Sequence, residues 1–573
     1  MISLLKQKLS EKNLDAILLN SKDPFLSEYA KEDYNLLEYF TGFTGSNGYL
    51  LLTKTQTILL TDGRYLEQAA RELGDSFEIW NLQDMHKIKL AKDLTINFPS
   101  LCFSVFEINL FKKTFNPDIK FSAQGLNFFR EDSKSLNFRS DVSCLSEKDA
   151  GVDIDTKLTN LLKELNLQPD ELYINADNSA ISWLFNLRSA DIAFNPVICS
   201  YLIIGPDKVR LFADFTDFAD HKKLTSQVSS IKIEIIAKSE LESLVPQLSP
   251  VTKDVKLDPK ITNYFFSECF SKSNINYIAD PLIAAKSLKN KSEIANIEAA
   301  HILDGIALTK FLYWLDQHPN KSDLSELDAI DKLASFRIKS DKYMGPSFPT
   351  ICGFAENGAI IHYKANKQTN LKFSKDSLVL IDSGGQYHYG TTDVTRTIAI
   401  GKPTADMIKS FTLVLKGHIG LSDLKFPKRN SGAALDAIAR QYLWQEGLDY
   451  AHGTGHGVGY YLNVHEGPQS ISSRSFNAVL KASMVVSNEP GYYKSGDYGI
   501  RIESLELVTE YNENFLALKT LTLAPIDINL IDRERLTKTE IKWYNDYHNR
   551  IIEELGTKLT KNEITWIKGH NIT

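Results

Sequence analysis

Residues 379–397 read VLIDSGGQYHYGTTDVTRT. The stretch opens with an apolar run that ends at Asp382, and Asp393 follows eleven residues later beside a second strand-like run. A hairpin through residues 384–390 would bring both carboxylates to one place. Two ionised carboxylates repel each other at short distance, so such a pair needs a proton or a cation between them. The stretch therefore predicts a sheet-containing domain with an acidic site at a strand end.

Three later segments supply more groups of the same kind. HGTGHGVG at 452–459 is a glycine-dense loop in which backbone and imidazole can approach a small site. Glu489 ends an apolar run, and in GIRIES Glu503 alternates with Arg501, which places both on one side of a strand. Two aspartates, one histidine and two glutamates form an oxygen-rich set with a single imidazole. Such a set suits two divalent cations bridged by carboxylates and a hydroxide.

Other catalytic patterns do not fit this sequence. HEGPQ at 465–469 is not H-E-x-x-H, and we find neither a G-x-S-x-G elbow nor a P-loop lysine motif. TGFTGSNG at 41–48 is interpreted as a glycine-rich connection inside an α/β domain, not as a phosphate loop. A single acidic residue is more often a turn residue or an ion-pair partner than a ligand. Five such residues at strand ends, with extra histidines nearby, favour a metal centre.

The composition is that of a soluble globular protein. Its 573 residues are 43% hydrophobic and 24% charged, which is enough apolar material for several domains. A net charge of −7 argues against a nucleic-acid binder or a basic membrane binder. No apolar run approaches the ~18 residues of a membrane span, and the N-terminus predicts an amphipathic helix, not a signal peptide. Five cysteines without a CxxC pair predict free thiols and a cytoplasmic protein.

The first 285 residues repeat a pattern. At an offset of 152, residues 49–62 (YLLLTKTQTILLTD) align without gaps with residues 201–214 (YLIIGPDKVRLFAD). Each is a predicted hairpin, and a strand-like segment precedes each one, at 15–20 and at 171–177. We interpret them as two related α/β domains, at 1–150 and 151–285. A chance likeness between two hairpins is the alternative.

From residue 289 the pattern changes. A long amphipathic helix is predicted from Ser292, with Glu293 in its first turn. Strands are then predicted at 359–363, 377–385, 395–400, 483–489 and 500–508, and a helix at 431–446. A last helix from Thr537 carries one apolar face, formed by Ile541, Tyr544, His548, Ile551 and Leu555. We expect a catalytic domain at 286–530 and a C-terminal helical extension at 531–573.

Together these segments resemble the pita-bread metallopeptidases, and among them the long, three-domain Xaa-Pro aminopeptidases. The likeness is carried by FPTICGFAENGAIIHY, TDVTRT, AHGTGHGVGYYLNVHEGP, NEPG and TDGRY, and it extends over essentially the whole chain. GFAEN at 353–357 is the part that matches least. The resemblance implies an α/β (α+β) protein with two creatinase-like N-terminal domains and a C-terminal pita-bread domain.

The resemblance also implies roles for single residues. Two metal ions, usually manganese with zinc or cobalt as alternatives, would be held by Asp382, Asp393, His456, Glu489 and Glu503. Glu489 would also accept a proton, and His465 would serve as proton shuttle and substrate contact. His362 (also a candidate catalytic residue) and His452 would line the pocket for the substrate and its proline, and Arg501 would be a substrate residue or an ion-pair partner. Surface or helix positions are expected for His301, His388 and His418.

The implied activity is release of the first residue from peptides that have proline second, through a metal-bridged hydroxide. Proline lacks an N–H and its ring fixes the chain direction, so a shaped site can select it. Prolidase action on Xaa-Pro dipeptides is the alternative with the same ligands. Metal-free creatinase-like chemistry and a non-enzymatic binding protein are disfavoured because no ligand is missing. A homodimer is expected from the resemblance, and because the apolar face of the helix from Thr537 needs a cover.

Overall fold

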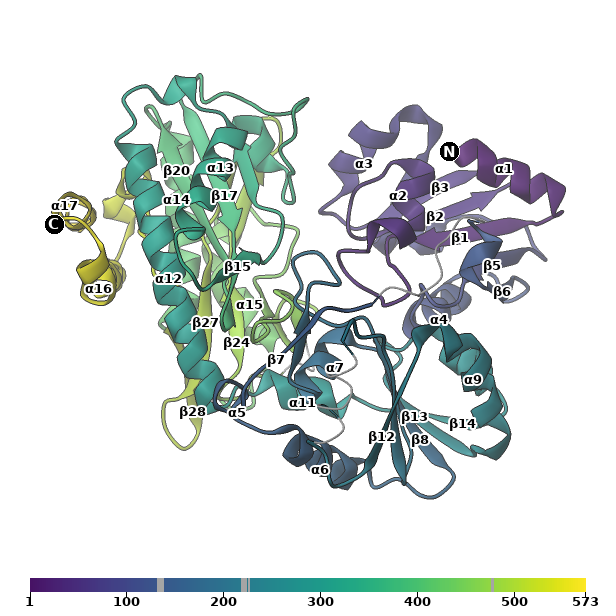
Figure 1. The fold of residues 1–573 in the computed structure, drawn as a ribbon. Coiled ribbons are helices and arrows are strands. Elements are labelled where there is room, and N and C mark those ends of the chain that lie inside the picture. Colours follow the sequence, from purple (N-terminus) through teal and green to yellow (C-terminus); the bar gives the residue numbers. More distant parts are fainter. Residues whose placement is uncertain (131–138, 218–223, 225–226, 476–478) are drawn as a thin grey trace. The chain divides into compact units, whose positions relative to one another are not determined.

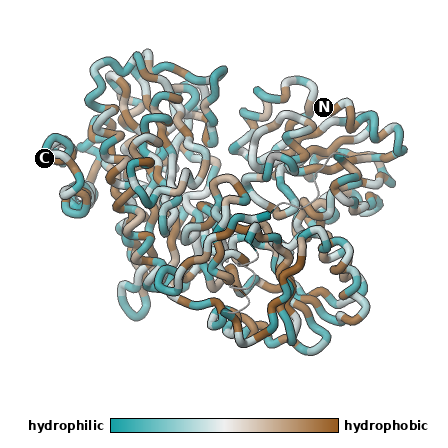
Figure 2. Tube along the Cα trace, in the orientation of Figure 1, coloured by the Kyte–Doolittle hydropathy of each residue, from teal (hydrophilic) through white to brown (hydrophobic). Residues whose placement is uncertain are grey.

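The computed structural model describes residues 1–130, 139–217, 224, 227–475 and 479–573. It divides into two compact units, Met1–Ile283 and Ala284–Thr573 (Figure 1). Each unit is built around sheets whose central strands are apolar and buried. Figure 2 shows hydrophobic segments in the interior of the sheets and hydrophilic ones along the outer loops.

The first unit contains two six-stranded sheets of identical topology, with strand orders β4-β3-β2-β1-β5-β6 and β12-β11-β10-β8-β13-β14. The strands of the first sheet are β1 (Ala16–Asn20), β2 (Gly48–Thr53), β3 (Thr57–Thr61), β4 (Glu78–Asn81), β5 (Thr95–Pro99) and β6 (Lys120–Gln124). Those of the second are β8 (Glu171–Asn175), β10 (Tyr201–Ile204), β11 (Lys208–Phe212), β12 (Lys232–Ile236), β13 (Asp254–Leu257) and β14 (Asn274–Tyr277). A small additional sheet pairs β7 (Val142–Cys144) with β9 (Leu187–Ser189).

Strand directions match between the two large sheets as well. The first strand of each pairs antiparallel with a hairpin and parallel with the strand on its other side. The hairpins, β2–β3 and β10–β11, are the two segments that align in sequence. Because order and direction agree for all six strands, the two α/β domains are related, as the sequence repeat predicts.

Helices flank these sheets. They are α1 (Ile2–Glu11), α2 (Leu36–Thr41), α3 (Leu66–Leu73), α4 (Val105–Thr114), α5 (Glu147–Ala150), α6 (Ile154–Leu165), α7 (Asn178–Leu184), α9 (Leu241–Leu248) and α10 (Tyr264–Cys269). The amphipathic N-terminal helix is present, and α3 ends where Gly74 takes a φ of 59°. Of the cysteines, Cys102, Cys199 and Cys352 are buried.

The second unit contains antiparallel sheets. A six-stranded sheet has the order β21-β28-β27-β24-β22-β23, and two three-stranded sheets have the orders β16-β17-β20 and β15-β18-β19. A two-stranded sheet pairs β25 with β26. The bounds are β15 (Tyr343–Pro346), β16 (Ile351–Phe354), β17 (Ser377–Ser383), β18 (Gly385–Tyr387), β19 (Gly390–Thr391), β20 (Val394–Ile400), β21 (Lys425–Pro427), β22 (Gly455–Gly457), β23 (Glu466–Ile471), β24 (Val485–Asn488), β25 (Gly491–Lys494), β26 (Tyr498–Arg501), β27 (Ser504–Glu510) and β28 (Phe515–Thr520).

The helices of this unit include the three that the sequence predicts. They are α11 (Pro281–Ser287, which starts in the first unit), α12 (Lys291–Asp316), α13 (Glu326–Arg337), α14 (Ala405–Ser422), α15 (Gly432–Trp444), α16 (Lys538–Leu555) and α17 (Lys561–Lys568). Asn290 caps α12 and forms a capping box with Glu293, and Thr537 does the same with Glu540 for α16.

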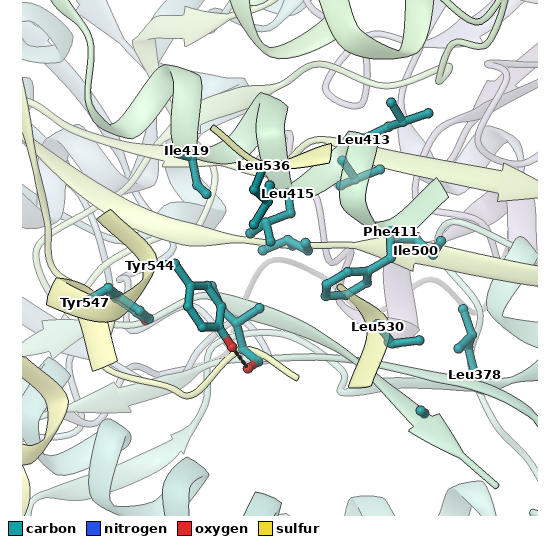
Figure 3. Packing of buried hydrophobic residues seen from close by; sticks show 14 of the residues in the cluster. Leu378, Phe411, Leu413, Leu415, Ile419, Ile500, Leu530, Leu536, Tyr544 and Tyr547 are labelled. Carbon is teal, nitrogen blue, oxygen red and sulfur yellow. Dashed lines mark hydrogen bonds between the residues drawn. The ribbon is translucent and has the colours of Figure 1, made fainter. Parts of the chain in front are cut away.

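The apolar face of α16 is covered by its own chain. Tyr544 and Ile551 belong to the same buried cluster as Leu415 of α14 and Ile500 of β26. Figure 3 shows Tyr544 among these side chains, and its hydroxyl donates to the carbonyl of Ile526 at 2.8 Å. The predicted face is confirmed, but the reason it gave for a dimer is wrong, because no second copy is needed to bury it.

Arg396 of β20 ties α16 to the sheet. Its guanidinium donates to the hydroxyl of Tyr547 at 2.8 Å and to the carbonyl of Glu503 at 2.6 Å. Further bonds run to the carbonyls of Ala524 and Pro525. Buried carbonyls of the chain segment that leads into the C-terminal helices are thereby satisfied by one side chain.

Two strand predictions in this unit are wrong. Residues 359–363 form no strand, because the chain turns through a short 3₁₀ helix, η8 (Ala355–Ala359), and a turn after it. Here glycines allow backbones to touch: a Cβ at Gly353 would lie 2.7 Å from Cα of Gly358, and one at Gly499 would overlap the carbonyl of Gly358. Residues 500–508 are not one strand either, since the chain leaves β26 after Arg501 and enters β27 at Ser504.

Candidate metal centre

Two neighbouring strands bring the aspartates together. Asp382 lies near the end of β17, which pairs antiparallel with β20 so that Asp382 faces Thr395. Asp393 immediately precedes β20. The residues between form the small β18–β19 hairpin, which pairs with β15. The predicted convergence of the two carboxylates is found.

The imidazole and the glutamates come from the six-stranded sheet. His456 lies in β22, next to β24, and Glu489 directly follows β24. Glu503 lies in the break between β26 and β27, where its backbone N–H donates to the carbonyl of Thr395 at 3.2 Å. That bond links the two sheets at the site. Glu503 belongs to the cluster although it lies outside both strands, so the alternation of side chains along a strand does not explain its position.

These side chains form three overlapping groups whose ligand atoms lie within 4.8 Å of one another. Among the described residues the groups are Asp382–Asp393–Glu503, His456–Glu489–Glu503 and Asp393–His456–His465. Nε2 of His456 is 3.4 Å from Oδ2 of Asp393 and 3.6 Å from Oε1 of Glu489. Asp393 and Glu503, which are each shared by two groups, are buried to 3% and 1% exposure.

The cluster carries more negative charge than the protein compensates. Burial raises the pKa of Asp382 to about 6, with Asp393 and Glu489 adding to the rise against the charge of Arg501. Burial and neighbouring carboxylates also raise the pKa of Glu489 and, more strongly, that of Glu503. Although burial alone would lower it, the hydrogen bond to Asp393 and the charge of Glu489 raise the pKa of His456 to about 9. Each shift is what crowded carboxylates produce without a bound cation.

The atoms present fit divalent cations. Oδ1 of Asp382 is buried with no hydrogen-bond partner among the described residues. His456 directs Nδ1 to the carbonyl of Gly457 at 2.9 Å, which leaves Nε2 toward the carboxylates. A ligand histidine is usually oriented by such a bond from its other nitrogen. Four carboxylates and one imidazole are a donor set suited to hard cations.

Arg501 is held by the protein on all sides. Its guanidinium donates to Oδ2 of Asp382 at 2.6 Å, to the hydroxyl of Tyr493 at 2.6 Å and to Oγ1 of Thr395 at 3.1 Å. Of the two roles expected for it, the structure shows the ion pair, and the pair is with Asp382. A direct contact between Arg501 and a substrate is not favoured by this geometry.

His452 is fixed through both ring nitrogens. Nε2 lies 2.9 Å from the Tyr493 hydroxyl, and Nδ1 lies 2.7 Å from the carbonyl of Gly453. Because the Tyr493 oxygen accepts from Arg501, its own proton points to Nε2, and Nδ1–H donates to Gly453. Both ring nitrogens are therefore engaged within the protein, and the side chain is only 7% exposed.

The other predicted histidines are more dispersed. His465 lies just before β23, and its ring stands edge-to-face 4.4 Å from that of His456. His362 is half-buried in the turn after η8 and belongs to none of the three groups. His301 and His418 are buried in α12 and α14, where burial lowers the pKa of both and that of His418 to about 3. His388 is exposed.

Sequence reasoning did not identify the residues that orient this cluster. Thr395 donates to Oε2 of Glu503 at 2.8 Å while accepting from Arg501, and Ser487 accepts from the N–H of His456 at 2.9 Å. Arg440 of α15 donates to the carbonyl of His452 at 2.6 Å and to Asp436 at 2.7 Å. Of these residues, only Thr395 could have been predicted from the sequence. It lies two residues after Asp393 in TDVTRT, and residues two apart in an extended chain point to the same side.

Comparisons with known proteins agree with this site. The model of metallopeptidase family M24 matches residues 295–510, and that of the C-terminal region of peptidase M24 matches 514–570. Two models of the creatinase/prolidase N-terminal domain match residues 1–100 and 135–293. The four matches follow the chain in the order of its folded parts.

Individual proteins match over the full length. Xaa-Pro aminopeptidase 1 of Dictyostelium discoideum is 37% identical over 99% of this chain and 95% of that protein. A probable Xaa-Pro aminopeptidase P of Paracoccidioides brasiliensis is 35% identical over 99% and 98%.

Among solved structures, X-prolyl aminopeptidase from Caenorhabditis elegans, described as a cytosolic enzyme with a di-nuclear active site, has a TM-score of 0.90 at 32% identity over 98% of this chain and 95% of that one. An Xaa-Pro dipeptidase from Bacillus anthracis shares the fold over 65% of this chain, with a TM-score of 0.52 at 21% identity. Identity above 30% along nearly the whole of both chains decides the assignment. This chain belongs to the Xaa-Pro aminopeptidases of metallopeptidase family M24.

Proposed function

We propose that this protein releases the N-terminal residue from peptides with proline at the second position. The observation that carries the proposal is the buried convergence of four carboxylates and one imidazole, with ligand atoms within 4.8 Å, in three overlapping groups. Relatives that match along their whole length carry this activity in their names. The shape of proline, which has no N–H and a fixed φ, gives such a site something to select.

Two divalent ions would be held by Asp382, Asp393, His456, Glu489 and Glu503. When bound, such ions lower the pKa of a water and polarise a carbonyl group. Glu489 would accept a proton from the attacking water, since its carboxylate lies at the end of β24 and is the most accessible of the four. Arg501 orients Asp382, and Thr395 orients Glu503.

His465 handles the second proton transfer. It stands beside His456 at the edge of the cluster and would pass the proton taken up by Glu489 to the departing proline nitrogen. His362 and His452 would line the pocket for the substrate and its proline. The free α-amino group of the substrate must also be held, which restricts cleavage to the first residue.

Two histidine variants test these roles. His465→Ala should keep its metal and lose about 100-fold or more in kcat, as expected for a lost acid–base group. His456→Ala should lose metal affinity and activity together. The measurements are metal stoichiometry and kcat for both variants. Because His465 also lies in one of the three groups, a His465→Ala protein without metal would make it a ligand, and one with normal turnover would make it structural.

A substrate comparison separates the enzyme classes. Rates on Xaa-Pro-Yaa peptides should exceed those on Xaa-Pro dipeptides, and replacing the proline by alanine should abolish cleavage. Activity confined to dipeptides would make the protein a prolidase. No metal and no cleavage of any of these peptides would leave a binding protein on the same fold.

Three finer properties complete the proposal. Manganese is the expected metal because the donor set is rich in oxygen, whereas zinc sites usually carry more nitrogen or sulfur; elemental analysis after reconstitution decides between them. A homodimer now rests on family resemblance alone, and light scattering will test it. A cytosolic location is supported by the description of the C. elegans enzyme as cytosolic. Among the described residues no helix is long and apolar enough to span a membrane.

A further inference from the structure

A buried ion pair involves the residue next to His465 in the chain. Nζ of Lys286, at the end of α11, is 2.5 Å from Oε2 of Glu466, and both side chains are at most 3% exposed. Glu466 is the residue after His465. Neither member of the pair belongs to the metal cluster.

The same carboxylate shapes the loop from the inside. Its other oxygen, Oε1, accepts from the backbone N–H of Asn463 at 3.2 Å. Asn463 in turn accepts at its carbonyl from the N–H of Gly459 at 2.9 Å. A Cβ at Gly459 would lie 2.5 Å from Oε1 of Glu466, and one at Gly457 would overlap the Glu466 carbonyl. Two glycines of the HGTGHGVG loop are therefore required to make room for Glu466.

Neutral hydrogen bonds hold Leu462 of the same loop. Gln386 of β18 donates to the carbonyl of Leu462 at 2.7 Å, and Thr391 of β19 accepts from its N–H at 3.3 Å. Glu466 is the only carboxylate in residues 457–466, and loss of its partner would leave a buried charge unpaired. The backbone on either side of His465 is thus fixed from two directions.

We propose that Lys286 and Glu466 are positioning residues for His465. The inference rests on the proposed role of His465 in proton transfer. By neutralising and anchoring Glu466, Lys286 fixes the backbone immediately after His465, and with it the ring that stands edge-to-face on His456. Lys289 reinforces the arrangement, since its Nζ donates to the carbonyl of Lys286 at 2.9 Å.

The test is a double-mutant cycle on the metal-loaded, full-length protein. Lys286→Met should lower kcat on an Xaa-Pro-Yaa peptide by about 10- to 100-fold, as displacement of a reacting group by about 1 Å does, with little change in KM. Lys286→Arg should restore most of it. In a His465→Ala background the same Lys286→Met change should cost less than about twofold, because residues that act as a unit are not additive. Equal losses in both backgrounds, or no loss in either, would overturn the proposal.

Controls separate positioning from general damage. Lys416→Met breaks another Lys–Glu pair of the same unit, Lys416–Glu540 at 2.7 Å between α14 and α16, whose side chains are 12% and 10% exposed, and should leave kcat unchanged. If Lys286→Met does not fold, Glu466→Gln replaces it, since the amide keeps the shape and removes the charge. A crystal structure of the folded variant gives a readout independent of activity. The His465 ring should have left its 4.4 Å edge-to-face contact with His456. A ring that has not moved would refute the inference, whatever the activity of the wild type. A wild type that does not cleave Xaa-Pro peptides would instead count against the proposed function.

Discussion

Metal-free protein should lose stability as the pH rises, and the share that comes from Asp382 can be sized; Glu489 and Glu503, whose pKa values are also raised, add losses of the same sign. Burial raises the pKa of Asp382 from 3.8 to about 6, so the folded state holds the proton more tightly than the unfolded chain does. The stabilising contribution is then complete below about pH 4 and is lost as the pH rises through about 6. A rise of about two units corresponds to about 3 kcal/mol. Bound cations should reverse the loss, because they favour the ionised carboxylate.

The assay compares chelated wild type with Asp382→Asn, whose side chain does not titrate. Urea unfolding is followed by tryptophan fluorescence, and the second unit contains Trp314, Trp444, Trp543 and Trp566. Between about pH 4 and pH 7 the wild type should lose about 3 kcal/mol relative to the variant. Added Mn²⁺ should stabilise the wild type more at the higher pH. A stability difference that stays constant with pH would refute the reasoning, because burial would then not perturb Asp382.

Two other substitutions test parts of the site that sequence reasoning did not supply. Thr395→Val removes the donor to Glu503 and the acceptor for Arg501. Metal affinity, measured by titration, should therefore fall about 10- to 100-fold. The control Thr397→Val loses bonds to the backbone of Arg501 and should keep the wild-type metal affinity. Gly499→Ala forces a methyl group into the carbonyl of Gly358 and should lower the free energy of unfolding by about 1 to 3 kcal/mol, the cost of overpacking. An unaltered melting temperature for Gly499→Ala would show that η8 moves aside freely.

The fold was predictable where local pattern and tertiary structure agree. Residues 49–61 form the predicted hairpin, because two apolar runs separated by a short turn segment pair antiparallel as neighbouring strands. Asp382 and Asp393 converge because antiparallel pairing of β17 and β20 follows directly from two apolar runs joined by a glycine-rich segment. The long helices at 291 and 538 begin at capping boxes, which are local in sequence.

Predictions failed where backbones from distant segments meet. AIIHY has the composition of a strand, but Gly353, Gly358 and Gly499 pack against one another and force a turn instead. The break after Arg501 is invisible in GIRIES, since alternation alone does not reveal that Glu503 must reach Thr395 of another sheet. The partners of Arg501 were equally hidden, because ion pairs between strands more than a hundred residues apart leave no local pattern.

The bonds of Arg396 have a consequence for how the protein is made. One guanidinium joins the carbonyl of Glu503 to the hydroxyl of Tyr547, so a residue of the centre is tied to a tyrosine of α16 that is synthesised 44 residues later. A nascent chain that has emerged only as far as β28 contains every proposed ligand and still lacks this tie. Activity should therefore appear late in translation, and a messenger that stops short of α16 should yield a protein with the complete motif and a loosened centre. Helix α16 thus completes the hydrogen bonding that holds the backbone of Glu503.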